Sequence, residues 1–78
     1  MTNYEKLDWL ITMTITGNSK FLGDILSDNL VFLEAERIAM ETGRDLYRIV
    51  DGRLQALRKR GVIRYAKGRG WVVVGDKK

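Results

Sequence analysis

The spacing of the apolar residues changes at Gly61, and this change constrains the fold more than any other feature of the sequence. Before Gly61, apolar residues recur at intervals of three and four, as they do on one face of a helix. These residues are Leu46, Ile49, Val50, Leu54 and Leu57. After Gly61, two short apolar and β-branched segments, 62–65 and 71–74, flank a glycine-containing turn at 66–70. We therefore predict a helix over about 45–60 followed by a two-stranded β-hairpin.

The N-terminal helix is expected from about Asn3 to Ile15. Thr2 and Glu5 have the spacing of a capping box, and apolar residues recur behind them at helical intervals. The end of this helix is rich in β-branched residues, so it could equally extend into a short strand before Gly17 closes it. The sequence leaves both alternatives open.

Two more helices are expected before the amphipathic one. Ser19 can cap a short second helix that carries apolar residues at positions 21, 22, 25 and 26. The polar segment 27–29 ends this helix and offers caps for a third, which is expected from about Leu30 to Thr42 and ends at Gly43. Asp45 is placed to cap the fourth helix. The predicted fold class is α+β, with three or four helices followed by the C-terminal hairpin.

Gly52 interrupts the helical pattern of 45–60. A glycine inside a helix costs about 1 kcal/mol relative to alanine. Either another group approaches the backbone closely at this position, or the helix restarts at Asp51 as a fresh cap. Both interpretations stay open.

The composition excludes several classes of function. With 78 residues the chain is expected to form one domain over 1–78, with a frayed tail at 75–78. It contains no cysteine and no histidine, which excludes a disulfide framework, a structural zinc site and the usual nucleophilic triads. Neither a cofactor nor an enzymatic activity is expected. The apolar runs are short and Met1 is not followed by a secretory leader, so we expect a cytoplasmic protein of a microbe or virus with no membrane contact.

The charge of the chain is divided between its two halves. Residues 1–43 contain three basic and seven acidic residues, for a net charge of −4. Residues 44–78 contain eleven basic and three acidic residues, for a net charge of +8. A basic face attracts a polyanion, so this asymmetry favours nucleic-acid binding on one side of the molecule. A solvated basic helix would give the same count, and the acidic residues of the first half are expected to be solvated.

The segment from Leu54 to Val73 resembles the recognition helix and wing of winged-helix domains. The shared pattern is a leucine-spaced helix ending in basic residues and Gly61, an apolar pair that opens a strand, the basic turn Lys67-Gly68-Arg69-Gly70, and the aromatic-x-aliphatic return strand Trp71-Val72-Val73. The resemblance is closest to small modules of phage and bacterial DNA-binding proteins. Two features depart from the pattern: the helix at 30–42 is an extra element, and Gly52 lies inside the recognition helix.

The resemblance implies that the helix at 45–60 enters the major groove and that the wing at 63–74 contacts the backbone or the minor groove. Arg48 and Gln55 carry groups that can pair with guanine and adenine edges, whereas the basic side chains at the end of the helix are better suited to phosphates. Trp71 is expected in the core. The predicted DNA-binding residues are Arg44, Arg48, Gln55, Arg58, Lys59, Arg64, Lys67 and Arg69.

The predicted function is double-stranded DNA binding without catalysis, as a phage or prokaryotic transcriptional regulator. Because one module of this size makes a small footprint on DNA, a homodimer is a possible form, and Val31, Phe32 and Met40 could supply its apolar surface. The alternative is a protein-interaction module, such as a phage-type inhibitor or adaptor of a host protein.

Overall fold

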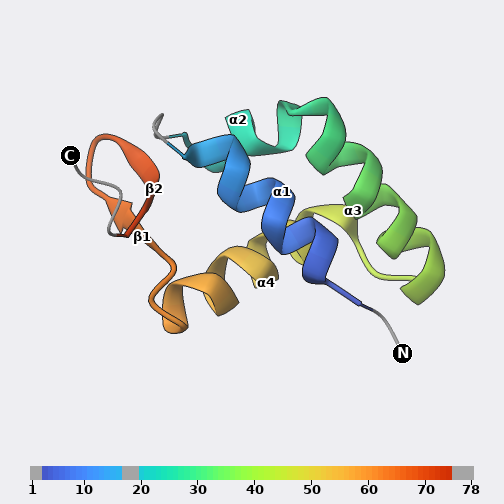
Figure 1. The fold of residues 1–78 in the computed structure, drawn as a ribbon. Helices are drawn as coiled ribbons and strands as arrows, with labels where there is room; N and C mark the ends of the chain where they lie inside the picture. The colour runs from blue at the N-terminus through green and yellow to red at the C-terminus, as the bar shows by residue number, and fades with distance from the viewer. Residues whose placement is uncertain (1–2, 17–19, 75–78) are drawn as a thin grey trace.

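The structure, a computed structural model, describes residues 3–16 and 20–74. Within these ranges four helices precede a two-stranded antiparallel hairpin, so the predicted α+β class is confirmed (Figure 1). Helices α1, α3 and α4 contact one another, and the hairpin lies beyond the C-terminal end of α4. The elements are α1 (Glu5–Ile15), α2 (Leu22–Ser27), α3 (Asn29–Thr42), α4 (Leu46–Lys59), β1 (Ile63–Ala66) and β2 (Gly70–Val73).

Helix α1 stays helical through its β-branched end, so the alternative of a strand at this end is wrong. The hydroxyls of Thr12, Thr14 and Thr16 each donate a hydrogen bond of 2.7–2.9 Å to the carbonyl four residues earlier. These bonds satisfy the threonine hydroxyls within the helix, where each can reach the carbonyl one turn earlier. At the start of α1, Asn3 Oδ1 accepts a hydrogen bond from the Glu5 amide. The capping roles expected of residues 2, 17 and 19 lie outside the described residues.

Helices α3 and α4 are joined by a short turn, and residues of the types that cap helices lie at both ends of α3 and at the start of α4. Asp28 caps α3, because its carboxylate accepts hydrogen bonds from the amides of Leu30 and Val31. Gly43, with φ of 74°, ends α3 in the left-handed conformation, as predicted. Asp45 occupies the N-cap position of α4, but its exposed side chain makes no capping hydrogen bond, so that part of the prediction is wrong.

Helix α4 continues through Gly52 without a restart at Asp51. Nothing in the described chain lies within 4 Å of the position that a Cβ on Gly52 would take, so no part of the fold requires a glycine there. At its C-terminal end, Gly61 has φ of 80° and donates a hydrogen bond to the carbonyl of Arg58, while Val62 donates to that of Leu57. This pair of bonds is a Schellman motif, which turns the chain from α4 into β1.

The core lies between the helices and extends to the hairpin. The predicted apolar face of α4 is buried, with Leu46 partly covered at its edge. The hairpin contributes Ile63 and Trp71, which confirms the core position of Trp71. The buried core consists of Leu7, Leu10, Ile11, Ile15, Ile25, Val31, Ala35, Ile38, Ile49, Val50, Leu54, Leu57, Ile63 and Trp71.

The hairpin is anchored by a backbone contact that the sequence did not indicate. Strands β1 and β2 pair from Ile63 opposite Val73 to Ala66 opposite Gly70, which leaves a three-residue loop. On its other edge, β2 forms an isolated antiparallel bridge to Lys20: the Trp71 amide donates to the Lys20 carbonyl at 2.6 Å and the Lys20 amide donates back at 3.2 Å. A Cβ on Gly70 would overlap with the Lys20 carbonyl, so this glycine is required by the close approach of two backbones.

Candidate nucleic-acid interface

All of the predicted DNA-binding residues lie on α4, beside it, or on the hairpin. The seven basic ones are exposed, and Gln55 is half-buried. Because the apolar face of α4 is fixed in the core, Arg48, Gln55 and Lys59 lie on the opposite side of this helix. The surface of α4 predicted to meet DNA is therefore present as an exposed polar face.

Gln55 is held by a neighbour on the same helix. Its Oε1 accepts a hydrogen bond of 3.0 Å from Arg58 Nε. The amide nitrogen of Gln55 makes no hydrogen bond among the described residues, and it could donate to a base edge without breaking the bond to Arg58.

The tip of the hairpin carries two exposed cations. The loop Lys67-Gly68-Arg69 is closed by a hydrogen bond of 2.9 Å from the Arg69 amide to the Ala66 carbonyl. Gly68 has φ of 82°, as the third position of a type II turn requires. Arg64 is also exposed, on β1, while Tyr65 packs edge-on against Trp71 with ring centroids 5.4 Å apart.

Arg53 is the basic residue of α4 that faces inward. It donates two hydrogen bonds of 2.8 Å to Asp8 on α1, and its guanidinium carbon lies 4.5 Å from the centre of the Tyr4 ring. The bonds to Asp8 raise the pKa of Arg53 above its ordinary value, so the guanidinium is fixed as a cation. Arg60 is more exposed and approaches the same carboxylate at 3.9 Å.

A pocket of about 230 Å³ lies between the start of α1 and α4. Two predicted DNA-binding residues, Arg44 and Arg48, line it, and neither forms an ion pair with another described residue. No pattern in the sequence indicates this pocket, because its other wall comes from the beginning of the chain. The full lining is Tyr4, Arg44, Arg48, Ile49, Gly52 and Arg53.

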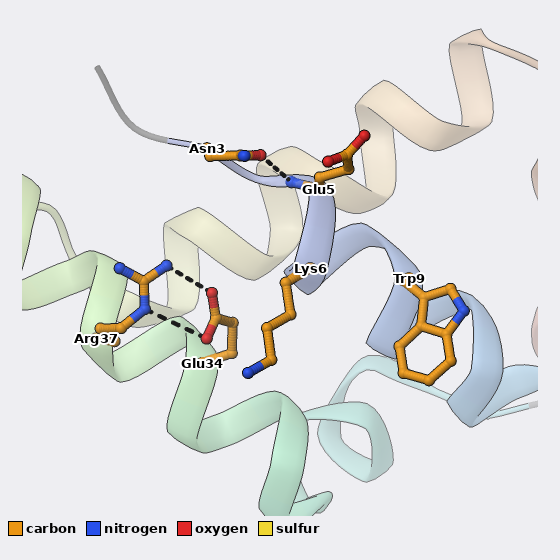
Figure 2. A pocket seen from close by; sticks show the side chains of 6 residues that line it. All are labelled: Asn3, Glu5, Lys6, Trp9, Glu34 and Arg37. Atoms are coloured by element: carbon orange, nitrogen blue, oxygen red, sulfur yellow. Dashed lines mark hydrogen bonds and ion pairs between the residues drawn. The ribbon is translucent and has the colours of Figure 1, made fainter.

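A second pocket, of about 620 Å³, lies on the acidic half of the molecule between α1 and α3 (Figure 2). Glu34 is buried here, and Arg37 donates two hydrogen bonds to its carboxylate, the shorter at 2.6 Å. These bonds are the main reason that the pKa of Glu34 lies below its usual range, although burial opposes the shift. The expectation that the acidic residues are solvated is therefore wrong for Glu34 and for Asp8, because each is held by an arginine.

Several large apolar side chains are exposed on the same two helices. Trp9 and Met13 lie one turn apart on α1, and Leu30 and Leu33 lie on α3. Their exposed fractions are between 52% and 61%. The suggested dimer surface needs correction, because Val31 points into the core and is fully buried, whereas Phe32 and Met40 are exposed.

Comparison of the chain with protein-family models, with curated proteins and with solved structures found no match. Over 3–16 and 20–74, no helix combines the length and the apolar character needed to cross a membrane. In the same ranges, acidic side chains do not gather in a group of three or more that could hold a metal ion.

Proposed function

We propose that this protein binds double-stranded DNA through α4 and the hairpin, as a winged-helix module without catalytic activity. The observation that carries the proposal is the exposure of seven basic side chains on or beside these two neighbouring elements, while the acidic half of the chain forms α1 to α3. The fold is compatible with a winged-helix shape. A role as a phage or prokaryotic transcriptional regulator stays a prediction from the sequence resemblance.

The connection between α3 and α4 supports the proposal that α4 enters the major groove. Two helices joined by a three- or four-residue turn that contains glycine are the arrangement of a helix-turn-helix, whose second helix enters the major groove. Here residues 43–45 join α3 to α4, and Gly43 provides the left-handed residue. Helix α3, which the sequence suggested as an extra element, is then the first helix of this motif and α4 is the second.

The experiment that tests the proposal is duplex DNA binding measured by fluorescence anisotropy between about 50 and 200 mM salt. We expect micromolar or tighter binding that weakens steeply with salt, because several cations displace counterions from the phosphates. Lys67→Ala should weaken all duplexes about equally and flatten the salt slope by roughly one unit. Lys6→Ala removes the same charge from α1 and serves as the matched control, with little effect expected. Binding that does not depend on salt, or no binding at all, would contradict the proposal.

The exposed apolar face supports a second candidate function, which is protein binding. Trp9, Met13, Leu30 and Leu33 are each more than half exposed on α1 and α3, two helices that contact each other, and exposed apolar side chains that gather on one face often mark protein contacts. The emission of Trp9 can report on this face, since Trp71 is buried. A blue shift with rising protein concentration would indicate a second copy, and a shift only on adding another protein would indicate a different partner.

A further inference from the structure

We infer that the pocket between Tyr4 and α4 is a phosphate-binding site, which holds one backbone phosphate of the bound DNA. This inference rests on the proposed function for the source of the phosphate. It changes the role of Arg48, which the sequence suggested as a reader of base edges, to that of a phosphate ligand.

One wall of the pocket is rigid. The Arg53 guanidinium is fixed by two hydrogen bonds to Asp8 and by its position over the Tyr4 ring. Tyr4 in turn precedes α1, whose buried face lies in the core. A group that enters the pocket therefore meets a surface that needs little reordering, and preorganised sites lose less entropy on binding.

The other wall supplies the positive charge. Arg44 and Arg48 are exposed, line the pocket, and form no ion pair with any described residue. Arg53 is already neutralised by Asp8, which leaves two uncompensated guanidinium groups. Guanidinium groups donate paired N–H bonds that match the oxygens of a phosphate, and the Tyr4 hydroxyl can donate one more.

Gly52 leaves room for the phosphate against the helix backbone. It lines the pocket one turn after Arg48, and nothing lies within 4 Å of the place its Cβ would occupy. The fold itself gives no reason for a glycine in the middle of α4. A phosphate that approaches the helix closely provides one, because a side chain at this position would occupy part of the pocket.

The first test uses inorganic phosphate and needs no DNA. The amide signals of ¹⁵N-labelled protein are followed while sodium phosphate replaces sodium chloride at constant ionic strength. We expect saturating shifts centred on Gly52, Arg48 and Arg44, and we expect Arg44→Ala with Arg48→Ala to abolish them. Shifts spread evenly over all exposed cations, or confined to the hairpin, would overturn the inference.

The second test uses Gly52→Ala in the DNA-binding assay. Alanine is the better helix former, so this variant should melt at a higher temperature than the wild type. It should nevertheless bind duplex DNA roughly tenfold more weakly, because the methyl group occupies space that the phosphate needs. Gly23→Ala, the same substitution at an open helical position of α2, is the matched control and should leave the affinity unchanged. Unchanged affinity of Gly52→Ala would contradict the inference.

The third test separates the two roles of Arg48. A phosphate ligand should, when changed to alanine, weaken every duplex by the same factor and flatten the salt slope by about 0.9. A reader of base edges should instead alter which sequences are preferred. A changed preference would overturn the inference and leave DNA binding in place. Absence of binding to any duplex would overturn the proposed function, and the phosphate titration would then decide whether the pocket is an anion site.

Discussion

Arg53 on α4 donates hydrogen bonds of 2.8 Å from Nε and Nη2 to the two carboxylate oxygens of Asp8 on α1. The Arg53 and Asp8 side chains are 22% and 15% exposed, so solvent screens this pair less than it screens an ion pair on the surface. The pair joins residues that are 45 positions apart in the sequence and links α4 to α1. It is therefore a structural contact, although Arg53 belongs to the most basic helix of the chain.

Breaking this pair should destabilise the fold. We expect Asp8→Ala and Arg53→Ala each to lower the free energy of unfolding by about 1–3 kcal/mol, because each leaves a partly buried charge without its partner. In a double-mutant cycle from urea denaturation, the double variant should lose less than the two single losses added together. Glu41→Ala removes an exposed ion pair with Arg37 and should cost less than about 1 kcal/mol. A coupling near zero would show that Asp8 and Arg53 act independently.

Two glycine-to-alanine changes should have opposite effects on stability. Gly70→Ala should destabilise by about 1–3 kcal/mol, because Gly70 has φ of 93° and an added methyl group overlaps with the Lys20 carbonyl. Gly52→Ala should stabilise by about 1 kcal/mol, because the position is helical and open. Thermal melts followed by circular dichroism measure both. Equal melting temperatures for the two variants would argue against the bridge between β2 and Lys20.

The two tryptophans should differ in their contribution to stability when each is changed to alanine and the variants are melted in the same way. Trp71 is 6% exposed and joins the hairpin to the core, so Trp71→Ala should cost roughly 3–5 kcal/mol and leave little or no cooperative transition. Trp9 is 60% exposed, and Trp9→Ala should change stability by less than about 0.5 kcal/mol. A cooperative melt near the wild-type temperature in Trp71→Ala would place this ring outside the core.

Acid should weaken the fold through Glu34. Hydrogen bonds from Arg37 lower the pKa of Glu34 below its value of 4.5 in the unfolded chain. The unfolded state therefore binds a proton first as the pH falls, so the stabilisation is complete above 4.5 and is lost as the pH drops through the lowered value. Glu34→Gln lacks this titration. The stability of the wild type relative to Glu34→Gln should fall as the pH drops below 4.5, and a constant difference would contradict the assignment.

The C-terminal half of the fold was predictable because its signals are local. The apolar spacing in α4, the left-handed Gly61 and the glycine-containing turn each act within a few residues, and the structure confirms them. The exposed cations of α4 were predictable for the same reason, since a helix with one face in the core must place its remaining residues outside.

Three features that the sequence did not indicate join distant segments. The bridge from Lys20 to Trp71 is made by backbone groups, which carry no side-chain signal, so Gly70 was interpreted only as a turn residue. The pairing of Asp8 with Arg53 depends on the angle between two helices. The pocket at Gly52 was missed because it needs Tyr4 as well as α4.

The bridge between Lys20 and Trp71 also bears on the lifetime of the folded state. More than half of the chain lies between these two residues, so the bridge closes a long loop, and this entropic cost favours its formation after the local helices and the hairpin turn. Contacts that form after the folding barrier affect the rate of unfolding more than the rate of folding. The short strand pairing at Lys20 should therefore slow the unfolding of the native protein and leave its rate of folding almost unchanged.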